Sequence, residues 1–136
     1  MPHRITDRPG TDEYAPFYQG YVGAVPEGDL MALLEQQLVE TTTMLQRLSP
    51  EVAASRYAEG KWSVLEVIGH IADTERVMAY RALRIGRGDA TPLPGFDQDA
   101  FVIGSPAHAL SLADLLADLR DAVSYTHLTL PTIYSV

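Results

Sequence analysis

Apolar side chains recur at three- and four-residue spacings in three stretches of the chain, and each stretch follows a residue that can cap a helix. The first stretch begins after Asp29, whose carboxylate can accept the free amide hydrogens of a helix start, and it stops before Pro50. Its apolar positions are Leu30, Leu33, Leu34, Leu38, Met44, Leu45 and Leu48. This pattern predicts an amphipathic helix of about five turns.

The second stretch opens with a capping box, in which Ser63 is followed three residues later by Glu66. Its apolar positions are Val64, Val67, Ile68, Ile71, Met78, Ala82 and Ile85. Gly86 and Gly88 then offer easy left-handed helix caps. The spacing predicts a long helix between these limits, joined to the first by a connection over 51–61.

The third stretch follows Ser111, which can cap a helix start together with Asp114, and its helical pattern fails after Val123. Its apolar positions are Leu112, Leu115, Leu116 and Leu119. The segment 89–110 before it is rich in Pro and Gly and predicts a loop with a short helical turn over 97–102. No strand-like alternation occurs before Val123, so the sequence predicts an all-α fold.

Residues 1–28 carry Pro, Gly and several aromatic side chains without a helical or strand period. The aromatics are Tyr14, Phe17, Tyr18 and Tyr21. A solvated linker would carry few of them. We therefore expect an ordered arm packed on the domain formed by 29–123.

The last stretch, 124–136, changes character abruptly, because it carries Thr, Tyr and Pro but no Asp, Glu, Lys or Arg. The run 124–132 resembles the translation of a transposon-derived sequencing adapter, as found at the ends of metagenomic reading frames. We therefore expect 124–136 to be a non-native tail on a truncated domain, and His127 to have no functional role. The alternative is a natural β-prone tail.

Composition narrows the classes of function. Ten Lys and Arg against eighteen Asp and Glu give a net charge of -8, which argues against nucleic acid or an anionic membrane as a partner. The chain has no Cys, so disulfides, thiolate metal sites and a cysteine nucleophile are excluded. No apolar run is long enough for a signal peptide or a membrane span, and we expect a cytoplasmic protein.

Polar residues of the second predicted helix gather beside its apolar face. With 100° per residue, the side chains within about 60° of one another are Glu66, His70, Asp73, Thr74, Val77 and Arg81. His70 could bind a metal through one ring nitrogen while Asp73 or Glu66 orients the ring through the other. The alternative is a hydrogen-bonded structural histidine.

Two polar residues, Gln37 and Thr41, fall inside the apolar arc of the first predicted helix. They either bond backbone and neighbouring side chains or line a pocket around a polar centre.

Other catalytic signatures are missing from the sequence. It contains no G-x-S-x-G, no P-loop, no G-x-G-x-x-G and no His-Glu-x-x-His. The basic residues Arg76, Arg81, Arg84 and Arg87 lie near Asp73 and Glu75, which favours a salt-bridged helix face over a phosphate-binding patch.

Several ordered motifs carry a family resemblance. Lys61-Trp62-Ser63 leads to Gly69-His70-x-x-Asp73, and a Thr-Pro-Leu-Pro-Gly-Phe-Asp run follows over 91–97. The chain resembles the DinB/YfiT-like family of metalloenzymes over residues 8 to about 123.

The resemblance implies a DinB-like four-helix up-down-down-up bundle in which three histidines bind a divalent metal, nickel or zinc. His70 matches the ligand on the second helix. The other two ligands form an H-x-x-x-H pair on the fourth helix, which has no counterpart in this chain. We therefore expect a bundle that lacks the fourth helix and the end of the third, and that binds a metal weakly or not at all.

For the intact protein the resemblance implies a metal-dependent hydrolase or thiol transferase acting on a small molecule. In that hypothesis His70 is a metal ligand, Asp73 or Glu66 orients it, and Gln37 and Thr41 line the pocket. The rival hypothesis is a non-catalytic helical module or homodimer in which His70 is structural.

Overall fold

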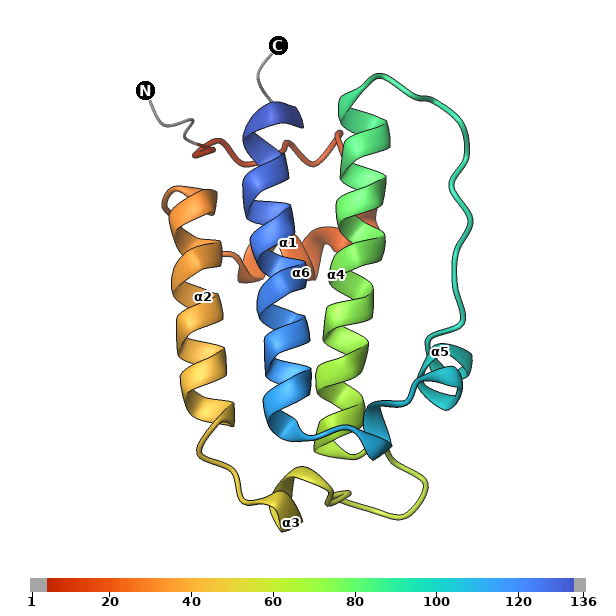
Figure 1. The fold of residues 1–136 in the computed structure, drawn as a ribbon. Helices are drawn as coiled ribbons and strands as arrows, with labels where there is room; N and C mark the ends of the chain where they lie inside the picture. Colours follow the sequence, from red (N-terminus) through yellow and green to blue (C-terminus); the bar gives the residue numbers. More distant parts are fainter. Residues whose placement is uncertain (1–4, 134–136) are drawn as a thin grey trace.

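A computed structural model describes residues 5–133, and these residues form helices and loops without a strand (Figure 1). Three helices are long: α2 (Leu30–Leu45), α4 (Val64–Gly86) and α6 (Leu112–Ile133). The short elements are η1 (Pro16–Tyr18), α1 (Gln19–Ala24), α3 (Pro50–Ala53), α5 (Gln98–Gly104) and η2 (Ala107–Ala109). The predicted all-α class is confirmed.

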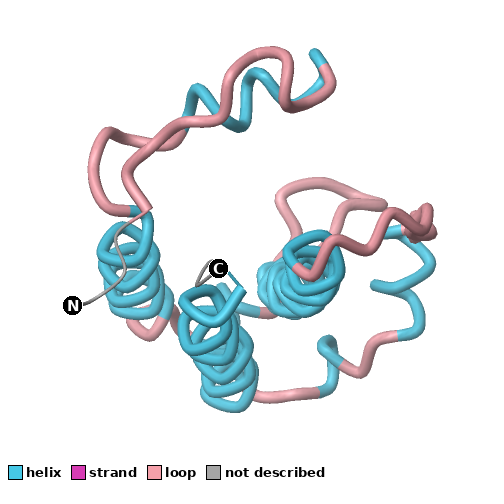
Figure 2. The backbone as a smooth tube through the Cα atoms, turned by 90° about the horizontal axis from the view of Figure 1, so that it is seen from above, coloured by secondary structure: helices cyan, strands magenta, loops and turns pink. Residues whose placement is uncertain are grey.

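The three long helices run in the order up, down, down. In Figure 1, α2 runs opposite to α4, whereas α4 and α6 run parallel and are joined by the long connection that carries α5 and η2. Figure 2 looks along the helices and shows α6 packed beside both α2 and α4. This order agrees with the first three helices of the predicted bundle.

The predicted capping residues begin all three long helices. Asp29 accepts from the Met31 amide at 3.4 Å, and Ser111 Oγ accepts from the Asp114 amide at 3.0 Å. The capping box at Ser63 is complete, as described with the site below. Each cap satisfies amides that the first helical turn leaves without a partner.

Small side chains let α4 and α6 approach closely. The buried residues of α4 include Gly69, Ala72 and Ala79, and Ala72 packs in one core cluster with leucines of α6. A Cβ added at Gly69 would lie 2.8 Å from the Cβ of Ala107 in η2. The main core of the described residues comprises Ala53, Leu65, Ile68, Ala72, Ala107, Leu115, Leu116, Leu119 and Ala122.

The buried face of α4 is rotated by part of a turn from the apolar face that the sequence pattern predicts. Of the apolar positions that define this face in the sequence, Ile68 is buried, but Ile71, Met78 and Ile85 are 42%, 47% and 67% exposed. The sequence pattern weights large apolar side chains, but close packing against α6 selects the small ones. The large residues therefore form an apolar stripe on the exposed side of α4.

The predicted end of the third helix is also wrong, because α6 continues past Val123 to Ile133. The hydroxyls of Thr126 and Thr129 donate to carbonyls one turn earlier, at 3.2 and 2.7 Å. Leu130 is buried against Met31 of α2. These contacts offset the low helix propensity of the segment. Pro131, which disfavours a helix interior, also lies inside α6.

The described part of the N-terminal arm is hydrogen-bonded to the start of α2 through Ile5. Ile5 exchanges hydrogen bonds with Asp29 and Leu30, at 3.0 and 2.8 Å. The aromatic rings of Phe17, Tyr18 and Tyr21 contact one another and remain largely exposed. Figure 2 shows the arm standing away from the long helices over most of its length.

Within residues 5–133, none of the helices combines the length and the apolar character that a membrane crossing requires.

Candidate functional site

His70 lies in the second turn of α4 with one ring nitrogen unused. Its Nδ1 is buried and has no hydrogen-bond partner among the described residues. Its Nε2 lies 3.5 Å from Thr74 Oγ1, one turn along the helix, and its ring contacts Trp62 with 4.9 Å between centroids. A buried nitrogen without a partner costs free energy, and such atoms in native proteins often serve a ligand or an ion.

Asp73 carries a perturbed carboxylate near His70. Burial raises its pKa above the ordinary value, and the nearby Asp118 carboxylate raises it further, whereas Arg76 and His70 lower it. Among the described residues no hydrogen bond joins Asp73 to the imidazole, so its orienting role stays a prediction.

Glu66 caps the N-terminus of α4 rather than contacting His70. Its Oε1 accepts from the Ser63 amide at 3.0 Å, while Ser63 Oγ accepts from the Glu66 amide at 3.2 Å. The same carboxylate pairs with Arg56 at 2.6 Å. The backbone hydrogen bond from Ser63 is the main reason why the pKa of Glu66 is lowered. Capping and ion pairing therefore account for Glu66 without a contact to His70.

The structure does not bring Gln37 and Thr41 to His70. Gln37 is exposed and lines a hollow of about 360 Å³ with residues 24–26 of the arm and with its own helix. Thr41 is half-buried, and its neighbour Thr42 is the buried threonine, which donates to the Leu38 carbonyl at 2.8 Å. The predicted pocket-lining role of this pair has no support in the described contacts.

The arginines of α4 are engaged with acceptors, as expected for a salt-bridged face. Arg76 forms a bidentate ion pair with Asp118 of α6, with hydrogen bonds of 2.7 and 3.1 Å. Arg84 pairs with Asp89 at 2.5 Å, and Arg81 donates to the Pro94 carbonyl at 2.8 Å. The first pair joins the two parallel helices, which the sequence spacing did not reveal.

The described residues supply one candidate ligand for a metal ion, which is His70. No group of three or more His, Asp or Glu side chains able to hold an ion occurs within residues 5–133. His70 Nδ1 is a suitable donor, but a stable site with bound divalent metal needs three or four protein ligands. The chain by itself therefore offers part of a metal site, and no catalytic step follows from this set alone.

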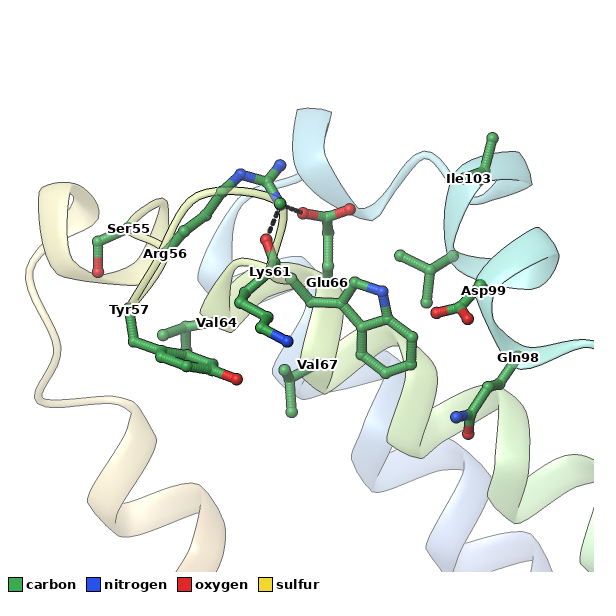
Figure 3. Close-up of a pocket in the computed structure, with 13 residues that line it drawn as sticks. Ser55, Arg56, Tyr57, Lys61, Val64, Glu66, Val67, Gln98, Asp99 and Ile103 are labelled. Atoms are coloured by element: carbon green, nitrogen blue, oxygen red, sulfur yellow. Dashed lines mark hydrogen bonds and ion pairs between the residues drawn. The ribbon is translucent and has the colours of Figure 1, made fainter.

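A cavity of about 1060 Å³ opens at the N-terminal end of α4, one turn before His70, which does not line it (Figure 3). Its walls are the loop before α4, the first turn of α4, and α5. Trp62 lines this cavity and also contacts the His70 ring. Sequence reasoning missed the cavity, because no periodicity places α5 opposite the loop that carries Lys61 and Trp62.

An all-helical bundle with a half-buried histidine on its second long helix defines the class of this protein. Comparison with protein families matches residues 33–133 to the DinB superfamily. The chain therefore belongs to the DinB superfamily, and the predicted resemblance is confirmed.

One curated relative, from Oceanobacillus iheyensis, is named "Putative metal-dependent hydrolase" and is 30% identical over 87 residues. The match covers 58% of this chain, and the chain spans half the length of that relative. No solved structure matches the chain.

Proposed function

We propose that this domain contributes His70 as one ligand of the divalent-metal centre of a hydrolase. The observation that carries the proposal is the buried Nδ1 of His70, which has no hydrogen-bond partner within residues 5–133 of a chain that belongs to the DinB superfamily. The name of the Oceanobacillus iheyensis relative supports metal dependence and hydrolysis. Zinc and nickel are the expected ions, since both accept imidazole nitrogen.

The neighbours of His70 have defined parts in this proposal. Trp62 and Thr74 restrict the orientation of the ring, through the ring contact at 4.9 Å and the hydroxyl at 3.5 Å. Asp73 favours a positive charge nearby, because its own burial leaves its carboxylate poorly solvated. A thiol substrate in place of water would make the same centre a transferase, and the reaction is tested by assay of both classes.

The experiment is a titration of the chain with Zn²⁺ and with Ni²⁺, followed by calorimetry. We expect weak binding, with a Kd of about 0.1 to 1 mM, because one imidazole supplies most of the affinity. The H70F variant should lose this binding. H108A, which removes an exposed imidazole of η2, is the matched control and should bind as the wild type does. Equal binding by H70F and wild type would refute the proposal.

A second candidate function is a non-catalytic helical module that self-associates. The observation that favours it is the exposed apolar stripe of α4, which includes Val67, Ile71 and Met78. Apolar patches on a helix face mark protein contacts in many proteins. In this candidate His70 has a structural role, and the two candidates differ in what replacement of His70 does to stability, as argued below.

A further inference from the structure

The cavity at the N-terminal end of α4 contains two charged side chains that have no partner among the described residues. Lys61 is the single lysine of the chain, and its ammonium has no hydrogen-bond or ion-pair partner within residues 5–133. Asp99 of α5 also lines the cavity, and its carboxylate likewise has no partner there. Figure 3 shows the two side chains on opposite sides of the cavity, one from each wall.

The remaining charged pair of the cavity is already neutralised. Arg56 binds Glu66 at 2.6 Å and donates to the Lys61 carbonyl at 2.5 Å. This pair fixes the loop before α4 against the first turn of α4, and it leaves neither group free for a ligand. Counted within residues 5–133, the cavity therefore offers one cation and one anion without partners, and no net charge, in a protein of net charge -8.

Between the two charges the wall is apolar and aromatic. It includes Trp62, Val67 and Val102, and the exposed side chain of Ile103 lies at its rim. Trp62 also contacts the His70 ring, with 4.9 Å between the ring centroids. A ligand packed on the indole would thus lie one side chain away from the imidazole.

We propose that this cavity binds a small apolar zwitterion, of the class of α-amino acids and short peptides. Lys61 receives the carboxylate, Asp99 receives the ammonium, and the apolar part packs on Trp62. A volume of about 1060 Å³ in an open cavity accommodates a dipeptide. The inference deepens the proposed function, on which it rests, by naming the substrate class of the His70 site.

The test uses Trp62, the single tryptophan of the chain, as a fluorescence reporter. L-leucine and the dipeptide Leu-Leu are titrated into the metal-free chain. We expect a saturable change in tryptophan emission with at least one of them. N-acetyl-Leu-Leu, which lacks the ammonium, and Leu-Leu amide, which lacks the carboxylate, should each bind about fivefold more weakly than Leu-Leu.

Two variants test which charged group of the ligand Lys61 and Asp99 each bind. K61M should weaken Leu-Leu about fivefold while leaving Leu-Leu amide unchanged, because the amide has no carboxylate for Lys61 to receive. D99N should weaken Leu-Leu and leave N-acetyl-Leu-Leu unchanged. R47M and D12N remove exposed charges outside the cavity and serve as matched controls, with circular dichroism to verify folding.

The absence of a saturable change with both zwitterions would overturn the inference. It would also be overturned if the blocked dipeptides bound as well as Leu-Leu, or if K61M and D99N had no effect. These results are independent of the metal, so the proposed function stands or fails separately on the zinc and nickel titration of H70F.

Discussion

At the residue scale, His70 combines an ordered ring with an unused nitrogen. The ring contacts Trp62 and lies within reach of Thr74, while its buried Nδ1 has no partner in the part of the chain that the structure describes. A histidine kept for structure would normally direct both nitrogens at partners or at water. The arrangement therefore carries a cost in stability that a ligand would recover.

Replacing His70 by phenylalanine tests this cost. H70F keeps an aromatic ring against Trp62 and removes the unpaired nitrogen, so the free energy of unfolding should stay the same or rise by about 1 kcal/mol. Urea denaturation measures it. L65A is the control for the sensitivity of the assay, because it truncates a buried side chain of α4 and should cost about 3 kcal/mol. A loss of about 2 kcal/mol or more in H70F would instead favour the structural role.

Asp89 gives a prediction for acid stability. Hydrogen bonds from the side chain and backbone of Thr91, and from Arg84, lower its pKa from 3.8 to about 2. Because the folded-state pKa lies below that of the unfolded chain, the carboxylate stabilises the fold above pH 3.8, and this contribution is lost as the pH falls toward 2.

D89N lacks that titration. The wild type should therefore be more stable than D89N at neutral pH, and the difference should shrink as the pH falls from 3.8 toward 2. Urea denaturation at a series of pH values measures the difference. A difference that stays constant over this range would show that the hydrogen bonds do not hold the ionised form.

At the scale of elements, the contact of α4 with η2 depends on a glycine. At Gly69, an added methyl group would meet Ala107 Cβ at 2.8 Å. Alanine favours a helix over glycine by about 1 kcal/mol, but overpacking a close contact costs about 1 to 3 kcal/mol. G69A should therefore lower the free energy of unfolding by about 1 kcal/mol.

The matched control is G104A in α5, where an added Cβ meets open space. Its effect on the free energy of unfolding should be within about 0.5 kcal/mol. If G69A were as stable as G104A, α4 and η2 would pack less closely than the structure shows.

The starts of the helices could be predicted from the sequence because caps act locally. Ser63 and Glu66 lie three residues apart and satisfy each other in the folded chain. The buried face of α4 could not be predicted in this way, since glycine and alanine contribute little to a hydrophobic pattern. The end of α6 depends on the packing of Leu130 on Met31, which joins distant parts of the chain.

The candidate site was predictable only where one helix carries it. His70 and Asp73 share a face of α4, so helical geometry alone brings them together. The link from Gln37 to His70 required two helices to face each other, and the periodicity of one helix does not determine that. The cavity at Lys61 and Asp99 depends on the placement of α5 after a long loop.

At the scale of the whole molecule, an exposed apolar stripe occurs on a chain of net charge -8. Apolar contact favours association between copies, and the shared charge opposes it. We expect reversible self-association that strengthens with salt, because salt screens the repulsion. Light scattering after size exclusion, at low and high salt, measures it.

A variant on the stripe identifies the surface. I71E should abolish the salt-dependent association, whereas V39E, at an exposed position of α2, should leave it unchanged. Association of I71E equal to that of the wild type would exclude the α4 stripe as the contact.

The expectation that residues 124–136 are non-native stays a prediction. The family match and α6 both include residues up to 133. Sequencing the source DNA beyond codon 123 decides the matter: a frame that continues differently would confirm an adapter-derived tail, and an unchanged frame would refute it.

The central claim is that His70 is the metal-binding residue of this domain. Its most direct test is a ¹⁵N spectrum of the histidine rings during titration with Zn²⁺, with H70F used to assign the His70 signals. We predict that the His70 Nδ1 resonance moves first, ahead of that of the exposed His108. A His70 resonance that stays fixed while other histidines respond would contradict the claim.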